Sequence, residues 1–148
     1  MKLSAKARYA VRILLDLARH LDEGPVRTTD ISGRTGVSAR FIEQILKPLK
    51  KAALVTSTRG ATGGYTLVVR PEDISLARVI RIIEGSLCLT QCCENPSVCS
   101  RSSHCRSHRA WVRVSQVLDA ELESISIKDL QDDTLSCTGP DCACCPTP

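Results

Sequence analysis

Three cysteines and a histidine occur at regular intervals in the second half of the chain. Cys93, Cys99, Cys105 and His108 are separated by five, five and two residues. Thiolate sulfur and neutral imidazole nitrogen are ligands for soft and borderline metal ions. The residue types and their spacing therefore predict a metal centre, and Cys92 is an adjacent thiol that could replace Cys93 with a shift of one residue.

The length of the spacers favours an iron-sulfur cluster over the alternatives. Structural zinc sites usually use two pairs of ligands with two to four residues between the members of each pair. Iron-sulfur clusters need thiolates that surround a larger core, which suits the turn-rich spacers 94–98 and 100–104. A histidine ligand would raise the reduction potential of such a cluster and make it depend on pH. Zinc, a thiol switch or purely structural cysteines remain alternatives.

The nine cysteines could also belong to a secreted, disulfide-bonded scaffold. However, charged residues interrupt positions 1–20, which leaves no apolar stretch suited to a signal or membrane segment. An odd number of cysteines also cannot pair completely. We therefore expect a cytoplasmic chain with reduced thiols and no membrane partner.

Charge is distributed unevenly along the chain. Residues 1–81 contain 15 Lys and Arg against 7 Asp and Glu, whereas residues 82–148 contain 5 against 9. A basic half joined to an acidic, cysteine-bearing half indicates that the first half binds a polyanion. A solvated charged face is the alternative.

The basic half shows the pattern of a helix-turn-helix. Apolar spacing predicts a helix from about Ala5 to Leu21 capped by Ser4, a short helix over 29–34 capped by Thr28 and ending at Gly36, and a third helix that begins at Ser38. Pro48 predicts a kink or an early end of this third helix near Lys47.

The outer face of the third helix has the chemistry to read bases. Its polar residues are Arg40, Glu43, Gln44 and Lys47, opposite an apolar stripe formed by Phe41, Ile42, Ile45, Leu46 and Leu49. Arginine and lysine donate to guanine, glutamine pairs with adenine, and glutamate accepts from cytosine while it repels phosphates. The alternative is an ordinary amphipathic helix with a wet face.

A hairpin is expected next. The runs Leu54–Thr58 and Tyr65–Val69 favour strands, and the segment between them begins with Arg59 and Gly60. This predicts a wing whose arginine enters a narrow minor groove. The alternative is a plain turn in which Gly63 and Gly64 supply positive φ.

Two further helices flank the cysteine loop. Ser75 caps an expected helix over 76–84 that stops at Gly85, and a helix of about twenty residues is expected from near Cys105 to Glu123. The stripe Trp111, Val114, Leu118 and Leu122 of this second helix needs a partner. A symmetric homodimer would supply it and present two recognition helices to DNA, whereas packing on its own subunit is the alternative.

The last residues form a separate segment. Residues 136–148 contain Cys137, Cys142, Cys144 and Cys145 among threonine, glycine and proline. Such a composition favours a flexible tail, with metal binding or oxidation as the alternative.

Over residues 1–133 the sequence resembles the Rrf2 family of winged-helix transcription regulators. The resemblance rests on Met1–Ser4 and Arg8–Val11, on Phe41–Leu46, on Arg59-Gly60 with Gly63–Tyr65, and on the cysteine-histidine array followed by Trp111. The fold class it implies is mainly α with a small β-hairpin, a winged helix-turn-helix followed by a long C-terminal dimerisation helix. The corresponding division is 1–72 for DNA binding, 73–133 for the cluster loop and dimerisation helix, and 134–148 for the cysteine-rich tail.

Within the family, the sequence is most similar to the iron-sulfur cluster regulators. This similarity implies a 2Fe-2S cluster on Cys93, Cys99, Cys105 and His108, which the protein would use to sense iron-sulfur, redox or iron status. It also implies operator contacts by Ser38, Glu43 and Gln44 and a minor-groove contact by Arg59. The full set of DNA-contacting residues that we predict is Thr28, Ser38, Arg40, Glu43, Gln44, Lys47, Arg59 and Gly60.

Two other readings of the function remain. One is a zinc- or thiol-responsive regulator of the same fold, and the other is a metal-binding or metal-transfer module without a DNA function. We do not expect an enzyme, because no phosphate-binding loop, nucleophile motif or carboxylate pair is present in the sequence.

Overall fold

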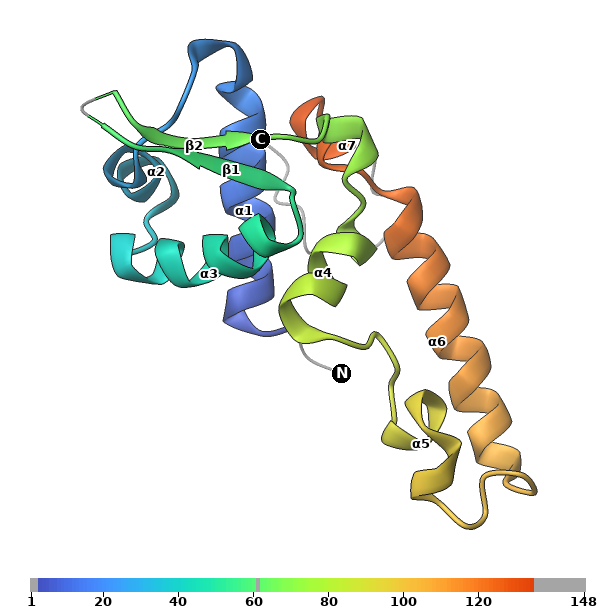
Figure 1. Ribbon diagram of the computed structural model, residues 1–148. Helices are drawn as coiled ribbons and strands as arrows, with labels where there is room; N and C mark the ends of the chain where they lie inside the picture. The colour runs from blue at the N-terminus through green and yellow to red at the C-terminus, as the bar shows by residue number, and fades with distance from the viewer. Residues whose placement is uncertain (1–2, 61, 135–148) are drawn as a thin grey trace.

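The computed structural model describes residues 3–60 and 62–134. Its helices α1 to α4 and its two strands form one body, from which the long helix α6 projects beside α4 (Figure 1). The elements, in chain order, are α1 (Ala5–Arg19), η1 (Leu21–Glu23), α2 (Thr28–Thr35), α3 (Ala39–Lys51), β1 (Val55–Thr58), β2 (Gly64–Leu67), η2 (Pro71–Asp73), α4 (Leu76–Glu84), α5 (Gln91–Glu94), η3 (Pro96–Val98), α6 (Arg106–Ser124) and α7 (Ile127–Gln131), where η denotes a 3₁₀ helix. This architecture confirms the predicted fold class.

The core is aliphatic and lies between α1, α3, α4 and α7. Ile13, Ile45, Leu46 and Ile127 are fully buried members of one continuous cluster. The start of α1 is fixed as predicted, because the hydroxyl of Ser4 accepts a hydrogen bond from the backbone N–H of Ala7 at 3.1 Å.

A partly buried ion pair holds α2 against α1. Arg34 donates two hydrogen bonds to the carboxylate of Asp16, at 2.7 and 2.8 Å. Asp16 is only 8% exposed, and the paired guanidinium compensates the cost of burying its charge. The helix-turn-helix is therefore anchored by a bidentate contact as well as by apolar packing.

Two of the predicted helix boundaries are wrong. Thr28 is the first residue of α2 and not its cap, because Arg27 occupies the cap position in extended conformation. The helix α3 does not end near Lys47 but continues through Pro48 to Lys51. Burial of Leu49 and the hydrogen bond from the Ala52 N–H to the Pro48 carbonyl stabilise the last turn despite the missing proline N–H.

The hairpin forms as predicted, with shorter strands. β1 and β2 pair antiparallel, with Val55 opposite Leu67 and Thr58 opposite Gly64. Tyr65 also exchanges two backbone hydrogen bonds with Val26, at 2.9 and 2.8 Å, which ties the wing to the segment before α2.

The expected role of the wing glycines is corrected by the structure. Positive φ occurs at Gly60, with a value of 113°, and not at Gly63 or Gly64. A Cβ at Gly64 would lie 2.4 Å from the Val26 carbonyl oxygen, and one at Gly63 would lie 2.4 Å from that of Thr58. These two glycines therefore allow close approach of backbones, whereas Gly60 makes the turn.

The helix α6 packs on its own chain along one side only. Leu122 packs against a small cluster of Ala77, Ile80 and Leu87, so this member of the predicted stripe is satisfied within the subunit. Trp111, Val114 and Val117 are 45%, 49% and 64% exposed. The exposed stripe is thus Trp111, Val114 and Val117, whereas Leu122, which lies about three turns after Trp111 on the same side of the helix, is covered by its own subunit. No helix within the described ranges is long and apolar enough to cross a membrane.

Candidate metal centre and nucleic-acid surface

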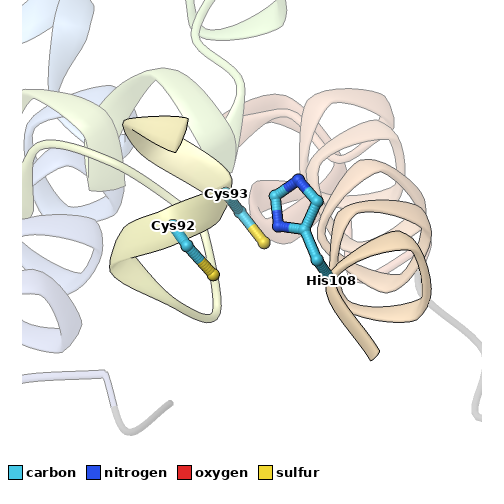
Figure 2. Close-up of side chains that lie close together, drawn as sticks. All are labelled: Cys92, Cys93 and His108. Carbon is cyan, nitrogen blue, oxygen red and sulfur yellow. The ribbon is translucent and has the colours of Figure 1, made fainter. Parts of the chain in front are cut away.

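Three ligand side chains meet where the cysteine loop lies against α6. The Sγ atoms of Cys92 and Cys93 and a ring nitrogen of His108 all lie within 4.8 Å of one another. The two cysteines come from the one-turn helix α5, and His108 comes from the first turn of α6 (Figure 2). This is a group of donor atoms for one metal ion, and Figure 2 shows Cys93 and His108 pointing toward each other.

Two features indicate that this group is built to hold a ligand. The Nδ1 atom of His108 is buried and has no hydrogen-bond partner among the described residues. Buried polar atoms are almost always paired, so an unpaired imidazole nitrogen beside two sulfurs fits a metal ligand. The hydroxyl of Thr90 lies 3.3 Å from the Cys92 sulfur and 3.0 Å from the Cys93 sulfur, which places both thiols on one side of α5.

The other two predicted ligands lie at helix ends of the same loop. Cys99 follows η3 directly, and Cys105 is the residue before α6. Hydrogen bonds from the Ser107 hydroxyl and from the His108 backbone lower the pKa of the Cys105 thiol, which is half-buried. In the described part of the chain neither residue belongs to the close group of Cys92, Cys93 and His108.

A cavity of about 660 Å³ opens beside the group. It is bounded by α4, the cysteine loop and α6, and its lining includes Arg81, Cys88, Cys93 and Ser115. The Leu89 backbone N–H donates to the buried hydroxyl of Ser115 at 3.1 Å. The cysteine loop is therefore hydrogen-bonded to α6, and its Leu87 packs against Ala77 and Ile80 of α4.

The predicted recognition residues lie on one accessible helix face. Arg40, Glu43, Gln44 and Lys47 are all exposed on α3, while the opposite face of that helix is buried. Ser38 is exposed at the N-cap of the same helix, without a side-chain capping bond. The side chains that we predict to contact bases are thus not used for packing in the core.

A hollow brings other predicted DNA contacts together. Its volume is about 520 Å³, and it lies between the start of α2 and the wing. Thr28 and Arg59, which are 31 positions apart in the sequence, both line it. Gly60 follows Arg59 at the exposed tip.

The fold and these two regions define a winged helix-turn-helix protein with a thiol-imidazole ligand group on an appended loop. The family model described as "Rrf2: Iron-dependent Transcriptional regulator" matches residues 3–133. The chain therefore belongs to the Rrf2 family of transcriptional regulators.

Individual relatives agree with this assignment. The chain is 40% identical over 133 residues to the HTH-type transcriptional regulator IscR of Aliivibrio salmonicida. The matched region covers 90% of this chain and 79% of the relative. Among solved structures, T. potens IscR is 34% identical, with a TM-score of 0.73 and coverage of 94% and 92% of the two chains. CymR, titled the global cysteine regulator of B. subtilis, is 31% identical, with a TM-score of 0.75 and coverage of 91% and 99%.

The sequence predicts Cys92 only as a substitute for Cys93, whereas the structure brings both sulfurs to the same histidine. The adjacency of the two cysteines was the available signal, but only the position of Thr90 and α6 shows that both side chains face the same way. The cysteines at 137, 142, 144 and 145 lie outside the described residues.

Proposed function

We propose that this protein is a DNA-binding transcriptional regulator whose affinity or site choice responds to a 2Fe-2S cluster. The observation that carries the proposal is the unpaired, buried Nδ1 atom of His108 beside Cys93, on a loop connected to both α4 and α6. Residues 1–72 bind DNA, residues 73–133 hold the cluster and dimerise, and residues 134–148 form a tail. The reduced thiols suit a cytoplasmic location.

The proposed ligands are Cys93, Cys99, Cys105 and His108. Three thiols and one imidazole are a donor set that fits an iron-sulfur cluster, and all four lie on one loop and the first turn of α6. When bound, the cluster supplies a centre whose oxidation state and presence depend on redox and iron conditions. The lowered pKa of Cys105 favours the thiolate form that ligation requires.

The DNA contacts divide into two kinds. Arg40, Glu43, Gln44 and Lys47 face outward from α3, where they meet base edges and phosphates of the major groove. Arg59 and Gly60 at the wing reach the minor groove, and Thr28 and Ser38 at two helix starts contact the backbone.

The cluster loop and the DNA-binding part are linked through α4. This helix packs against α1 and α3 on one side and against α6 on the other. Arg81 of α4 forms ion pairs with Asp119 and Glu123 of α6. A change in how Cys93 and His108 are ligated therefore shifts α6 and α4 together, and each ~1.4 kcal/mol of bias changes DNA affinity tenfold.

A homodimer completes the proposed regulator. The exposed stripe Trp111, Val114 and Val117 lies along α6 away from its own subunit. An isologous pairing of two such stripes removes this apolar surface from water and places two α3 helices on one DNA duplex.

The first experiment is a metal analysis of protein purified without oxygen. About two iron and two sulfide ions per chain, with thiolate-to-iron absorption bands, are expected. Cys99→Ala should lose the cluster, and its DNA affinity should then no longer respond to iron. A chain without iron after reconstitution, or a Cys99→Ala variant that still responds to iron, contradicts the proposal.

A thiol-redox regulator is the second candidate. The close approach of the Cys92 and Cys93 sulfurs and the 31% identity to the global cysteine regulator CymR favour it. Under this function the DNA affinity of the metal-free chain would change on oxidation and recover with a thiol reductant.

A further inference from the structure

The cysteine loop contains one more thiol at its centre than the proposed cluster uses. Cys92 takes part in the close group with Cys93 and His108, while Cys99 and Cys105 do not. All five cysteines of the described region are free thiols. The grouping of these side chains therefore differs from the ligand set proposed above.

We propose that Cys92, Cys93 and His108 form a mononuclear Zn²⁺ site in the cluster-free protein. Tetrahedral zinc with Zn–S bonds of about 2.3 Å and Zn–N bonds of about 2.0–2.1 Å places its ligand atoms roughly 3.5–3.8 Å apart. The three donor atoms already lie within 4.8 Å of one another. An inward shift of about 1 Å or less by each side chain therefore completes the coordination.

The chemistry of the group fits zinc and leaves one position open. Two thiols and one imidazole supply three ligands, and water supplies the fourth, as in zinc sites with three protein ligands. The unpaired Nδ1 atom of His108 gains a partner on metal binding. The Thr90 hydroxyl, 3.3 and 3.0 Å from the two sulfurs, is placed to donate a hydrogen bond to one of the thiolates and so to orient it.

The local fold explains why a single ion suits this group. Cys92 and Cys93 are neighbours on one turn of helix, and one hydroxyl touches both sulfurs. A compact set of this kind surrounds one ion, whereas a two-iron cluster needs two pairs of ligands on opposite sides. Cys99 and Cys105, which lie outside this close group, would supply further ligands to a cluster.

This inference rests on the proposed function in one respect, because the zinc site and the proposed cluster site both use Cys93 and His108. Zinc and the cluster therefore exclude each other. The cluster-free regulator would be a defined zinc-bound state in which α5 stays attached to α6, instead of a chain with an unstructured loop.

The test uses the full-length chain, freed of cluster and reduced, without oxygen. Zn²⁺ is titrated in competition with a chromophoric chelator, and Co²⁺ is used as a spectroscopic substitute. We expect Cys92→Ser to weaken Zn²⁺ binding at least about tenfold, since even residues that only orient ligands change metal affinity by about 10–100-fold. The thiolate-to-cobalt absorption of this variant should fall to about half.

Two cysteines of the same loop provide matched controls. Cys99→Ser and Cys88→Ser should bind Zn²⁺ with the affinity of the unsubstituted chain. The series is repeated in full-length chains that carry serine at Cys137, Cys142, Cys144 and Cys145, so that thiols of the tail do not contribute to the binding measured. Circular dichroism establishes that each variant is folded.

The outcomes separate this site from the proposed cluster. Zinc affinity that depends on Cys99 as strongly as on Cys92, or no zinc binding by the folded chain, overturns the proposal. Reconstitution of the same variants with iron and sulfide should give a cluster in Cys92→Ser and none in Cys99→Ser. If no variant assembles a cluster while zinc affinity still depends on Cys92, the proposed function fails and the zinc site stands.

Discussion

The guanidinium of Arg81 on α4 donates a hydrogen bond to Asp119 on α6 at 2.6 Å. A second N–H of the same side chain donates to Glu123, one helical turn further along α6, at 2.9 Å. The hydrogen bond to Asp119 raises the pKa of Arg81, so the guanidinium stays charged at any physiological pH. Arg81 also lines the cavity beside Cys93, so it joins α4, which packs against α1 and α3, to the neighbourhood of the candidate metal centre.

Replacing Arg81 should change the cluster dependence of DNA affinity more than it changes the free energy of unfolding. The side chains of this ion pair are 42% and 40% exposed, and exposed pairs contribute about 0.2–1 kcal/mol. We expect Arg81→Met to lower the free energy of unfolding by no more than about 1 kcal/mol. The difference in DNA affinity between cluster-bound and cluster-free protein should nevertheless shrink, and fluorescence anisotropy with a duplex selected by the unsubstituted protein measures it.

Arg70 is the control for this experiment. Its ion pairs in the described structure are with its neighbours Glu72 and Asp73, and none of them reaches α6. Arg70→Met should leave the cluster dependence unchanged. Equal loss of cluster dependence in both arginine variants would show that the effect does not pass through the Arg81 pairs.

Two of the charged residues on the outer face of α3, Glu43 and Lys47, should have opposite effects on DNA binding. Glu43→Ala removes an acceptor for cytosine and a repulsion toward phosphate, so affinity should hold or rise while discrimination at one base pair falls by about 1–3 kcal/mol. Lys47→Ala should weaken binding to all sequences and reduce the slope of log affinity against log salt by about 0.9. Binding to a panel of single-base variants at several salt concentrations measures both. Unchanged specificity in Glu43→Ala would exclude this residue from base reading.

The exposed apolar stripe on α6 predicts which substitution breaks the proposed dimer. Val114→Glu places a charge in the middle of the stripe and should convert the protein to a monomer, because burying an unpaired charge costs several kcal/mol. Ala120→Glu introduces the same residue at an exposed position outside the stripe and should leave the dimer intact. Sedimentation equilibrium distinguishes the two states. A Val114→Glu variant that remains a dimer would place the interface elsewhere.

Close backbone approach at the wing makes Gly64 sensitive to substitution. A Cβ there would lie 2.4 Å from the Val26 carbonyl oxygen, so Gly64→Ala should break the backbone pairing between Val26 and Tyr65. The expected loss of stability is about 2–3 kcal/mol, at the upper end for single substitutions. Gly33 lies inside α2 with no atom within 4 Å of its added Cβ, and Gly33→Ala should stabilise by roughly 0.4–1 kcal/mol. Urea denaturation of both variants checks the contrast.

The capping box at the start of α7 predicts a pH dependence. The Ser126 hydroxyl and the Ser126 backbone N–H both donate hydrogen bonds to the Asp129 carboxylate. These two bonds, of which that from the hydroxyl has the larger effect, lower the pKa of Asp129 below the ordinary 3.8. A carboxyl whose pKa is lower in the folded state stabilises that state fully above its unfolded pKa. This contribution disappears as the pH falls below 3.8 through the folded pKa.

Ser126→Ala tests this relation. Loss of the hydroxyl should raise the pKa of Asp129 toward the ordinary value, though not fully, because the backbone N–H still donates. Titration of the carboxyl carbon by NMR measures the change. A pKa that stays where it was in the unsubstituted protein would show that the hydroxyl has no part in the shift.

Local chemistry made much of the fold predictable from the sequence. Apolar spacing in α1 and α3, the caps at Ser4 and Ser75 and the stop at Gly36 depend on neighbours a few positions away. The predictions for the end of α3 and for the role of Gly64 failed because of contacts with residues that are distant in the sequence. The fully buried Leu49 keeps the last turn of α3 helical beyond Pro48, and the Val26 backbone explains Gly64 better than any turn geometry does.

The same division applies to the metal centre. The sequence alone predicts a thiol-imidazole ligand set at Cys93, Cys99, Cys105 and His108, because residue type and spacing define donor chemistry. Only the tertiary structure decided that Cys92 shares a site with Cys93 and His108 and that Leu122 packs within its own subunit while Trp111 remains exposed. Those outcomes depend on how α5 and α4 lie against α6, and such packing is set by contacts between residues that are distant in the sequence.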